Sequence, residues 1–164
     1  MSPLPERAPD VAVSISKLRL AIQPALAGIK HLNRLDNVLA RNEWHDAQIA
    51  EGLMCDDLGF VIEGTMSNLF AVQNNALYTP VLKKSGIEGV IRNRIIELAK
   101  ASNILVQQVA ITPVQLFQMN EVFLTNSLIG IWPVMQIDKQ VFIKGPVTRM
   151  LMENLDMEQG AYAL

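Results

Sequence analysis

The sequence has little cysteine, few aromatic residues and almost no net charge. Its single cysteine, Cys55, excludes an internal disulfide and suits a reducing compartment. Aromatic residues make up 5% of the chain and the formal net charge is −2. This balance offers neither the basic patches that bind nucleic acid nor a field that attracts acidic ligands from a distance. We therefore expect no nucleic-acid partner.

Long apolar runs are also missing. No stretch is long enough to cross a bilayer, and the first nine residues lack the charged and apolar blocks of a secretory signal. Those residues carry three prolines, which fit poorly into helices and sheets. We expect a cytoplasmic protein without a membrane partner, in which residues 1–10 form a linker.

The rest of the chain, residues 11–164, has the size of one domain with a sizeable core. Half of all residues are apolar and eight are methionine. Such a composition fits a domain that covers part of its surface with a partner, although a generous core looks similar.

The order of the expected elements indicates a mixed α/β fold. Alternating or continuous short apolar runs predict strands, and apolar residues at helical spacing predict helices. The expected strands are 11–22, 51–57, 60–63, 69–73, 76–79, 104–111 and 122–125, with turns at 57–59, 74–75 and 138–139. The expected helices are one directly after Lys30 to about residue 45, 91–102, a short one from Pro113 capped by Thr112, and 146–156. Most strands follow one another, which argues against a doubly wound order.

Lys30 stands at the start of one expected helix, whose buried face would carry Leu32, Leu35, Val38 and Leu39. A lysine at the mouth of a buried element is partly removed from water, which favours its neutral, nucleophilic amine. Taken alone, a surface lysine beside a helix start is the commoner arrangement.

Three short sequence motifs, which occur in a fixed order, favour the nucleophilic role of Lys30 over that of an ordinary surface lysine. Residues 28–35 read GIKHLNRL, residues 63–70 read EGTMSNLF, and residues 125–134 read TNSLIGIWPV. Together they resemble the fold-type IV pyridoxal phosphate (PLP) enzymes, and most closely the aminodeoxychorismate lyases. The family also includes branched-chain and D-amino-acid aminotransferases.

The resemblance implies an architecture. The large domain of these enzymes has mixed, mostly antiparallel strands in a barrel-like sheet with flanking helices. A smaller amino-terminal domain precedes the lysine domain in the family, whereas the resemblance here covers residues 11–164. We therefore expect the large domain of a longer enzyme, missing its amino-terminal domain and forming a homodimer.

The resemblance also assigns roles around the cofactor, PLP. Lys30 is the lysine that bonds to the cofactor aldehyde. Glu63 takes the position beside the ring nitrogen, where a carboxylate keeps that nitrogen protonated. Without the string that follows it, Glu63 reads as an exposed glutamate at a strand end.

Two segments are expected to hold the phosphate. A glycine ahead of the helix at 91 leaves backbone N–H groups free for an anion, and the resemblance places Val90 and Ile91 on the phosphate. Ile87 would pack on the ring face. Asn126 and Ser127 would bind the second side of the phosphate, with side-chain and backbone donors converging after a buried strand.

The other charged or titratable side chains near these motifs are not expected to bind the cofactor or a metal. Arg92 and Arg94 lie at helical spacing and are expected to be solvated or structural. His31 is next to Lys30, but neighbouring side chains on a helix point apart, so it is not expected to touch the cofactor. His31 and His45 are the only histidines and neither has metal-ligand spacing.

The resemblance implies a 4-amino-4-deoxychorismate lyase, which forms 4-aminobenzoate and pyruvate for folate synthesis. The runner-up is a branched-chain or D-amino-acid aminotransferase, because the first chemical steps are shared. A hypothesis of another class is an isolated, non-catalytic domain that binds a partner through the face its missing domain would cover.

Overall fold

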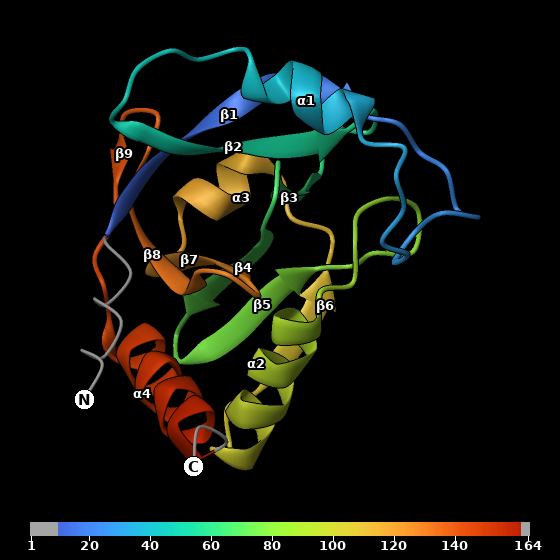
Figure 1. Ribbon diagram of the computed structural model, residues 1–164. Helices are drawn as coiled ribbons and strands as arrows, with labels where there is room; N and C mark the ends of the chain where they lie inside the picture. The colour runs from blue at the N-terminus through green and yellow to red at the C-terminus, as the bar shows by residue number, and fades with distance from the viewer. Residues whose placement is uncertain (1–9, 162–164) are drawn as a thin grey trace.

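The computed structural model describes residues 10–161, and all of its strands belong to one sheet (Figure 1). The strands are β1 (Val11–Leu20), β2 (Ile49–Asp56), β3 (Val61–Gly64), β4 (Asn68–Gln73), β5 (Ala76–Pro80), β6 (Val106–Val109), β7 (Glu121–Asn126), β8 (Gly130–Ile137) and β9 (Gln140–Val141). The helices are α1 (Leu35–Arg41), α2 (Val90–Ala101), α3 (Pro113–Phe117) and α4 (Pro146–Ala161). The linker expected at residues 1–10 lies outside the described residues, apart from Asp10.

The sheet closes on itself. Its order is β3-β2-β1-β8-β7-β4-β5-β6, and β3 also pairs with β4 through Glu63 and Asn68. The first six strands of this order therefore form a ring, which β5 and β6 extend. β1–β2, β1–β8 and β5–β6 are parallel, and the other pairings are antiparallel. The expected mixed, mostly antiparallel, barrel-like sheet with flanking helices is confirmed.

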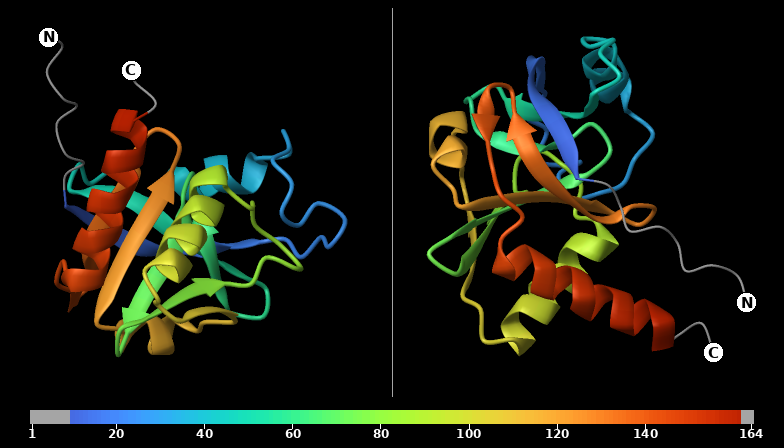
Figure 2. Two further views of the ribbon diagram at one scale, coloured as in Figure 1. Left: turned by 90° about the horizontal axis from the view of Figure 1, so that it is seen from below. Right: turned by 90° about the vertical axis from the view of Figure 1, so that its left-hand side faces the viewer.

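Alternation along the strands divides the core into an inner and an outer part. On β4, Leu69 and Ala71 join a buried cluster with residues from all six ring strands, so this cluster fills the barrel. Phe70 and Val72 point the other way and pack with α2 and α4. The rings of Phe70 and Phe123 stack there with centroids 5.0 Å apart. Figures 1 and 2 show α2 and α4 on one side of the sheet and α1 on the other.

Local sequence signals explain most element boundaries. Asn74 and Asn75 have φ angles of 51° and 61°, as a tight hairpin turn between β4 and β5 requires. Thr112 accepts a hydrogen bond from the Gln115 N–H, and the Gln115 side chain accepts one from the Thr112 N–H, so a capping box starts α3. The strand expected at 104–111 is shorter, and the last helix extends beyond 156 to Ala161.

None of the described helices is long and apolar enough to span a membrane.

The expected helix after Lys30 is wrong in its start and its buried face. α1 begins only at Leu35, and Leu32, Leu35 and Val38 are 100%, 63% and 55% exposed. The side chains that α1 buries are Asn37 and Ala40. Helical spacing shows that one face is apolar, but the barrel surface beneath α1 receives the other face. The apolar face is therefore left on the surface.

Candidate active site

The loop that carries Lys30 is fastened to the loop that leads into α2. The Gly28 N–H donates to the Gly86 carbonyl at 2.8 Å, and the Glu88 N–H donates to the Gly28 carbonyl at 3.0 Å. Gly28 and Gly86 have φ angles of 80° and 86°, which favour glycine. This backbone bridge holds Lys30 near the amino terminus of α2.

Lys30 itself is exposed and lines a cavity of about 540 Å³. The expected partial removal of its amine from water is therefore not provided by the residues described here. The reason is the late start of α1: Lys30 lies in a loop and not at the mouth of a buried helix.

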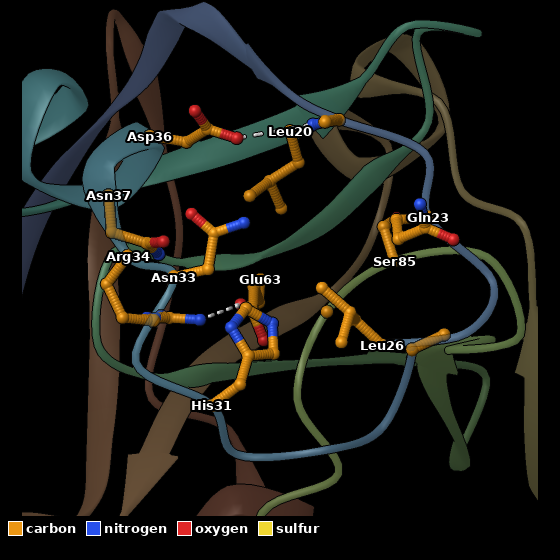
Figure 3. A pocket seen from close by; sticks show the side chains of 13 residues that line it. Leu20, Gln23, Leu26, His31, Asn33, Arg34, Asp36, Asn37, Glu63 and Ser85 are labelled. Carbon is orange, nitrogen blue, oxygen red and sulfur yellow. Dashed lines mark hydrogen bonds and ion pairs between the residues drawn. The ribbon is translucent and has the colours of Figure 1, made fainter.

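Glu63 lies on β3 and is 2% exposed, so it is not an exposed strand-end glutamate. Its Oε2 accepts a hydrogen bond from the Ile87 N–H at 2.8 Å. Its Oε1 lies 3.7 Å from the Arg34 guanidinium (Figure 3). Oε1 has no hydrogen-bond partner in the described part of the chain. One carboxylate oxygen thus remains available at the cavity wall.

Burial raises the pKa of Glu63 to about 7. The Ile87 N–H and the positive charges of Arg34 and Lys30 oppose this rise, while the nearby Glu51 carboxylate adds to it. A cation or an N–H donor placed at Oε1 would favour the ionised form. The surroundings of Glu63 therefore suit a site that receives a protonated ring nitrogen.

The amino terminus of α2 has the features of an anion site. Gly89 is the N-cap residue, no side chain caps the helix, and the first turn has no acidic residue. The N–H groups of Val90 and Ile91 are therefore not taken by a side-chain cap. A Cβ on Gly89 would collide with Asn68 Oδ1, and Asn68 Nδ2 donates to the Ile87 carbonyl at 2.7 Å. Close packing on Asn68 explains the glycine here.

The end of β7 and the residue that follows it supply another part of the wall. The side chain of Asn126 shapes its own turn, because Nδ2 donates to the Met66 carbonyl at 2.9 Å and Oδ1 accepts from the Leu128 N–H at 2.8 Å. Ser127 is exposed and lines the cavity. Ser127 is thus the more accessible side-chain donor of the pair.

The structure brings all the expected site residues to one cavity. Its volume of about 540 Å³ lies within the range of small-molecule sites. The seven expected residues that line it are Lys30, Glu63, Ile87, Val90, Ile91, Asn126 and Ser127.

Two further residues contribute to this site, and the sequence analysis did not predict a role for either. Arg34 lines the cavity and pairs with Glu63. Glu51 is fully buried on β2, where it accepts hydrogen bonds from the Thr65 N–H at 3.1 Å and from the Ser67 Oγ at 3.0 Å. It thereby holds the loop between β3 and β4 that lines the cavity. The sequence feature that could have indicated this role is the position of Glu51 within an otherwise apolar strand.

Arg92 and Arg94 make structural contacts. Arg92 is buried and donates to the Pro80 carbonyl and to Gln108 Oε1 at 3.1 and 3.0 Å. Arg94 pairs with Glu97 and Glu158 and so connects α2 to α4. Neither side chain needs a bound anion to explain its position.

Comparison with known proteins identifies the family. The family model for amino-transferase class IV matches residues 1–137, and the chain belongs to this family. It is 38% identical to an aminodeoxychorismate lyase of Vibrio harveyi over 150 residues, which are 89% of this chain and 55% of that relative.

Solved structures agree with this assignment. The 4-amino-4-deoxychorismate lyase from Pseudomonas aeruginosa matches with a TM-score of 0.89 and 43% identity, over 91% of this chain and 55% of that one. The T.th. branched-chain amino acid aminotransferase complexed with N-(5'-phosphopyridoxyl)-L-glutamate matches with a TM-score of 0.79 and 31% identity, over 88% of this chain and 51% of that one. The chain thus spans about half the length of these relatives.

Proposed function

We propose that this chain is the PLP-binding domain of a 4-amino-4-deoxychorismate lyase, which cleaves its substrate to 4-aminobenzoate and pyruvate. The observation that carries the proposal is the meeting of Lys30, Glu63 and the uncapped start of α2 at one cavity. The similarity to the Vibrio and Pseudomonas lyases supports this choice within the family.

The residues around the cavity fit PLP. Glu63 Oε1 is a buried acceptor without a partner among the described residues, which suits a protonated ring nitrogen. The N–H groups of Val90 and Ile91, together with Ser127, would hold the phosphate, and Ile87 would pack on the ring. When bound, PLP supplies an aldehyde for Lys30 and a ring that accepts electrons from the substrate.

Lys30 moves the proton in this proposal. Its Nζ, once free of the cofactor, takes the proton from the substrate carbon that bears the amino group. The carbon–oxygen bond to the enolpyruvyl group then breaks and the six-membered ring becomes aromatic. Lys30 returns the proton to the leaving fragment, which becomes pyruvate. Glu63 holds the proton on the ring nitrogen throughout.

A branched-chain or D-amino-acid aminotransferase is the second candidate, because the T.th. branched-chain aminotransferase has the same fold at 31% identity. Both reactions use the same lysine, cofactor position and first proton transfer. Pyruvate release without a keto-acid acceptor distinguishes them: the lyase forms pyruvate from 4-amino-4-deoxychorismate alone, whereas the aminotransferase needs the acceptor to turn over.

We also propose that residues 11–164 form the large domain of a cytoplasmic homodimer, with residues 1–10 as the linker to an amino-terminal domain. The coverage of about half of each relative supports the missing domain. The exposed apolar side chains of Leu32, Leu35 and Val38 support an additional protein surface that covers them. The free, buried Cys55 is compatible with the cytoplasm.

Borohydride labelling tests the cofactor site directly. Reduction in the presence of PLP should attach pyridoxal covalently to Lys30, which peptide mapping locates. Lys30→Arg should lose the label, whereas the matched control Lys83→Arg should keep it. A label on Lys17, Lys83 or Lys84 would contradict the proposed site.

A further inference from the structure

A second, smaller cavity of about 60 Å³ lies against Glu63 (Figure 3). The connection between β1 and α1 contributes His31 and Arg34 to its wall, and the connection between β5 and α2 contributes Ser85. Glu63 and Arg34 line both this cavity and the large one. These two side chains therefore separate the two spaces.

The wall of this small cavity concentrates buried polar atoms without partners. Among the side chains of residues 10–158, six buried atoms have no hydrogen-bond partner, and three of them belong to this wall: His31 Nδ1, Glu63 Oε1 and Ser85 Oγ. Glu63 and Ser85 are only 2% and 5% exposed. Buried polar atoms almost always bond to protein or to ordered water. Three such atoms around one cavity point to a shared ligand, and Oε1 can accept a second hydrogen bond from a ring nitrogen because a carboxylate oxygen has two lone pairs.

We propose that this cavity is a binding site for ordered water, which links Ser85 and His31 to Glu63 Oε1, and that Ser85 and His31 are positioning residues for Glu63. The consequence for catalysis rests on the proposed function of Glu63. The water site itself rests only on the cavity and its wall.

The size and chemistry of the cavity favour water over an organic ligand. One water needs roughly 10–15 Å³ of such volume and two to four polar partners. A volume of about 60 Å³ holds a few waters but is far below that of an ordinary small-molecule site. Leu20, Leu26 and Ala27 also line the wall and restrict the water to its polar side.

Water at Oε1 would act against the effect of burial on Glu63. Burial favours the neutral carboxyl, whereas a water that donates to Oε1 favours the carboxylate. The carboxylate form is the one that can hold a proton on a ring nitrogen. The charged and titratable groups that face Glu63 or line this cavity are Lys30, His31, Arg34, Asp36, Glu51 and Arg92.

The first test is the position of water. A high-resolution crystal structure of the cofactor-free chain should contain water within hydrogen-bond distance of Glu63 Oε1 and Ser85 Oγ. A dry cavity would overturn the proposal.

The second test is a carboxyl ¹³C NMR titration of the cofactor-free chain, in which the Glu63 signal is assigned by its loss in Glu63→Gln. Ser85→Ala and His31→Leu should each raise the pKa of Glu63, lowering its ionised fraction near neutral pH by about twofold or more. Ser85→Thr, which keeps the hydroxyl, should leave the pKa of Glu63 at its value in the natural chain. Thr148→Val is the matched control, because it removes a buried, unpartnered hydroxyl of α4 away from this cavity.

An unchanged Glu63 titration in folded Ser85→Ala and His31→Leu would overturn the positioning role. If Ser85→Ala does not fold, His31→Leu and the crystal structure still decide. Because neither readout needs PLP, a failure of this proposal is distinguishable from a failure of the proposed lyase function.

Discussion

The environment of Glu63 disfavours a negative charge on its carboxyl group. It is almost fully buried, and its nearest opposite charge, on Arg34, is 3.7 Å away on a partly exposed side chain. Burial raises its pKa from 4.5 to about 7. A residue held in this way reduces stability for the benefit of the site, and a cofactor that places a positive charge at Oε1 would reduce that cost.

The stability of the chain should depend on pH through the buried carboxyl group of Glu63. Well below pH 4.5 Glu63 is protonated in both the folded and the unfolded chain, so its burial then carries no electrostatic penalty. As the pH rises towards 7, the unfolded chain loses this proton first, so the free energy of unfolding falls by about 3 kcal/mol across the interval.

Glu63→Gln should remove this dependence, because the amide is neutral at every pH. The variant should be more stable than the natural chain at pH 8 and lose that advantage below pH 4.5. Urea unfolding at several pH values measures the difference, with the exposed Glu153→Gln as the control. If Glu63→Gln is less stable than the natural chain at pH 8, neighbouring groups already offset the cost of burying the Glu63 carboxylate in the cofactor-free chain.

The same substitution should have the opposite effect on catalysis. In the full-length enzyme, Glu63→Gln should keep PLP but lower kcat by about 10²-fold, because an amide cannot hold the ring-nitrogen proton as a carboxylate does. The PLP absorbance and the rate of pyruvate release measure the two effects. Unchanged turnover would mean that Glu63 has only a structural role.

At the scale of elements, two buried glutamates anchor neighbouring segments: one holds a loop and the other holds the start of a helix. Glu51 on β2 holds the β3–β4 loop through Thr65, Met66 and Ser67. Glu121 on β7 does the same for α4, accepting from the Val147 and Thr148 N–H groups at 3.3 and 2.8 Å. Of these two segments, the loop held by Glu51 lines the large cavity and α4 does not.

This difference allows a matched pair of variants. Glu51→Ala and Glu121→Ala should each destabilise the chain by about 3 kcal/mol, because each removes the acceptor of at least two hydrogen-bond donors. Glu51→Ala should also weaken PLP binding, whereas Glu121→Ala should not once stability is taken into account. Urea unfolding and PLP titration separate the effects. Equal losses of PLP affinity in both variants would contradict a local role for Glu51.

For the whole molecule, the cavity is open on the side of Lys30 and an apolar face of α1 is exposed. Catalysis needs a site that excludes water and fixes the reacting groups, and misplacement alone can cost about 10²-fold in rate. The chain by itself should therefore fold, bind PLP weakly, show little lyase activity and tend to self-associate.

To test activity, the chain is compared with a version extended at its amino terminus. To test self-association, it is compared with the double variant Leu32→Asp, Val38→Asp. The extended chain should gain pyruvate release, and the double variant should reduce association in sedimentation measurements without unfolding the chain. Equal activity with and without the extension would show that the site is already complete in these 164 residues.

Local signals in the sequence determined most element positions and, through three ordered strings, the family; the same strings are the source of the proposed site residues. Turn residues such as Asn74 and Asn75, the Thr112 cap and strand alternation act over a few residues, so they are readable without a fold. Only the tertiary structure decided that α1 presents its apolar face outward and that Glu51 holds a loop 14 residues away. It also decided that Glu63 stands between two cavities. These features depend on which surfaces meet when the barrel closes, and periodicity along the chain carries no information about that.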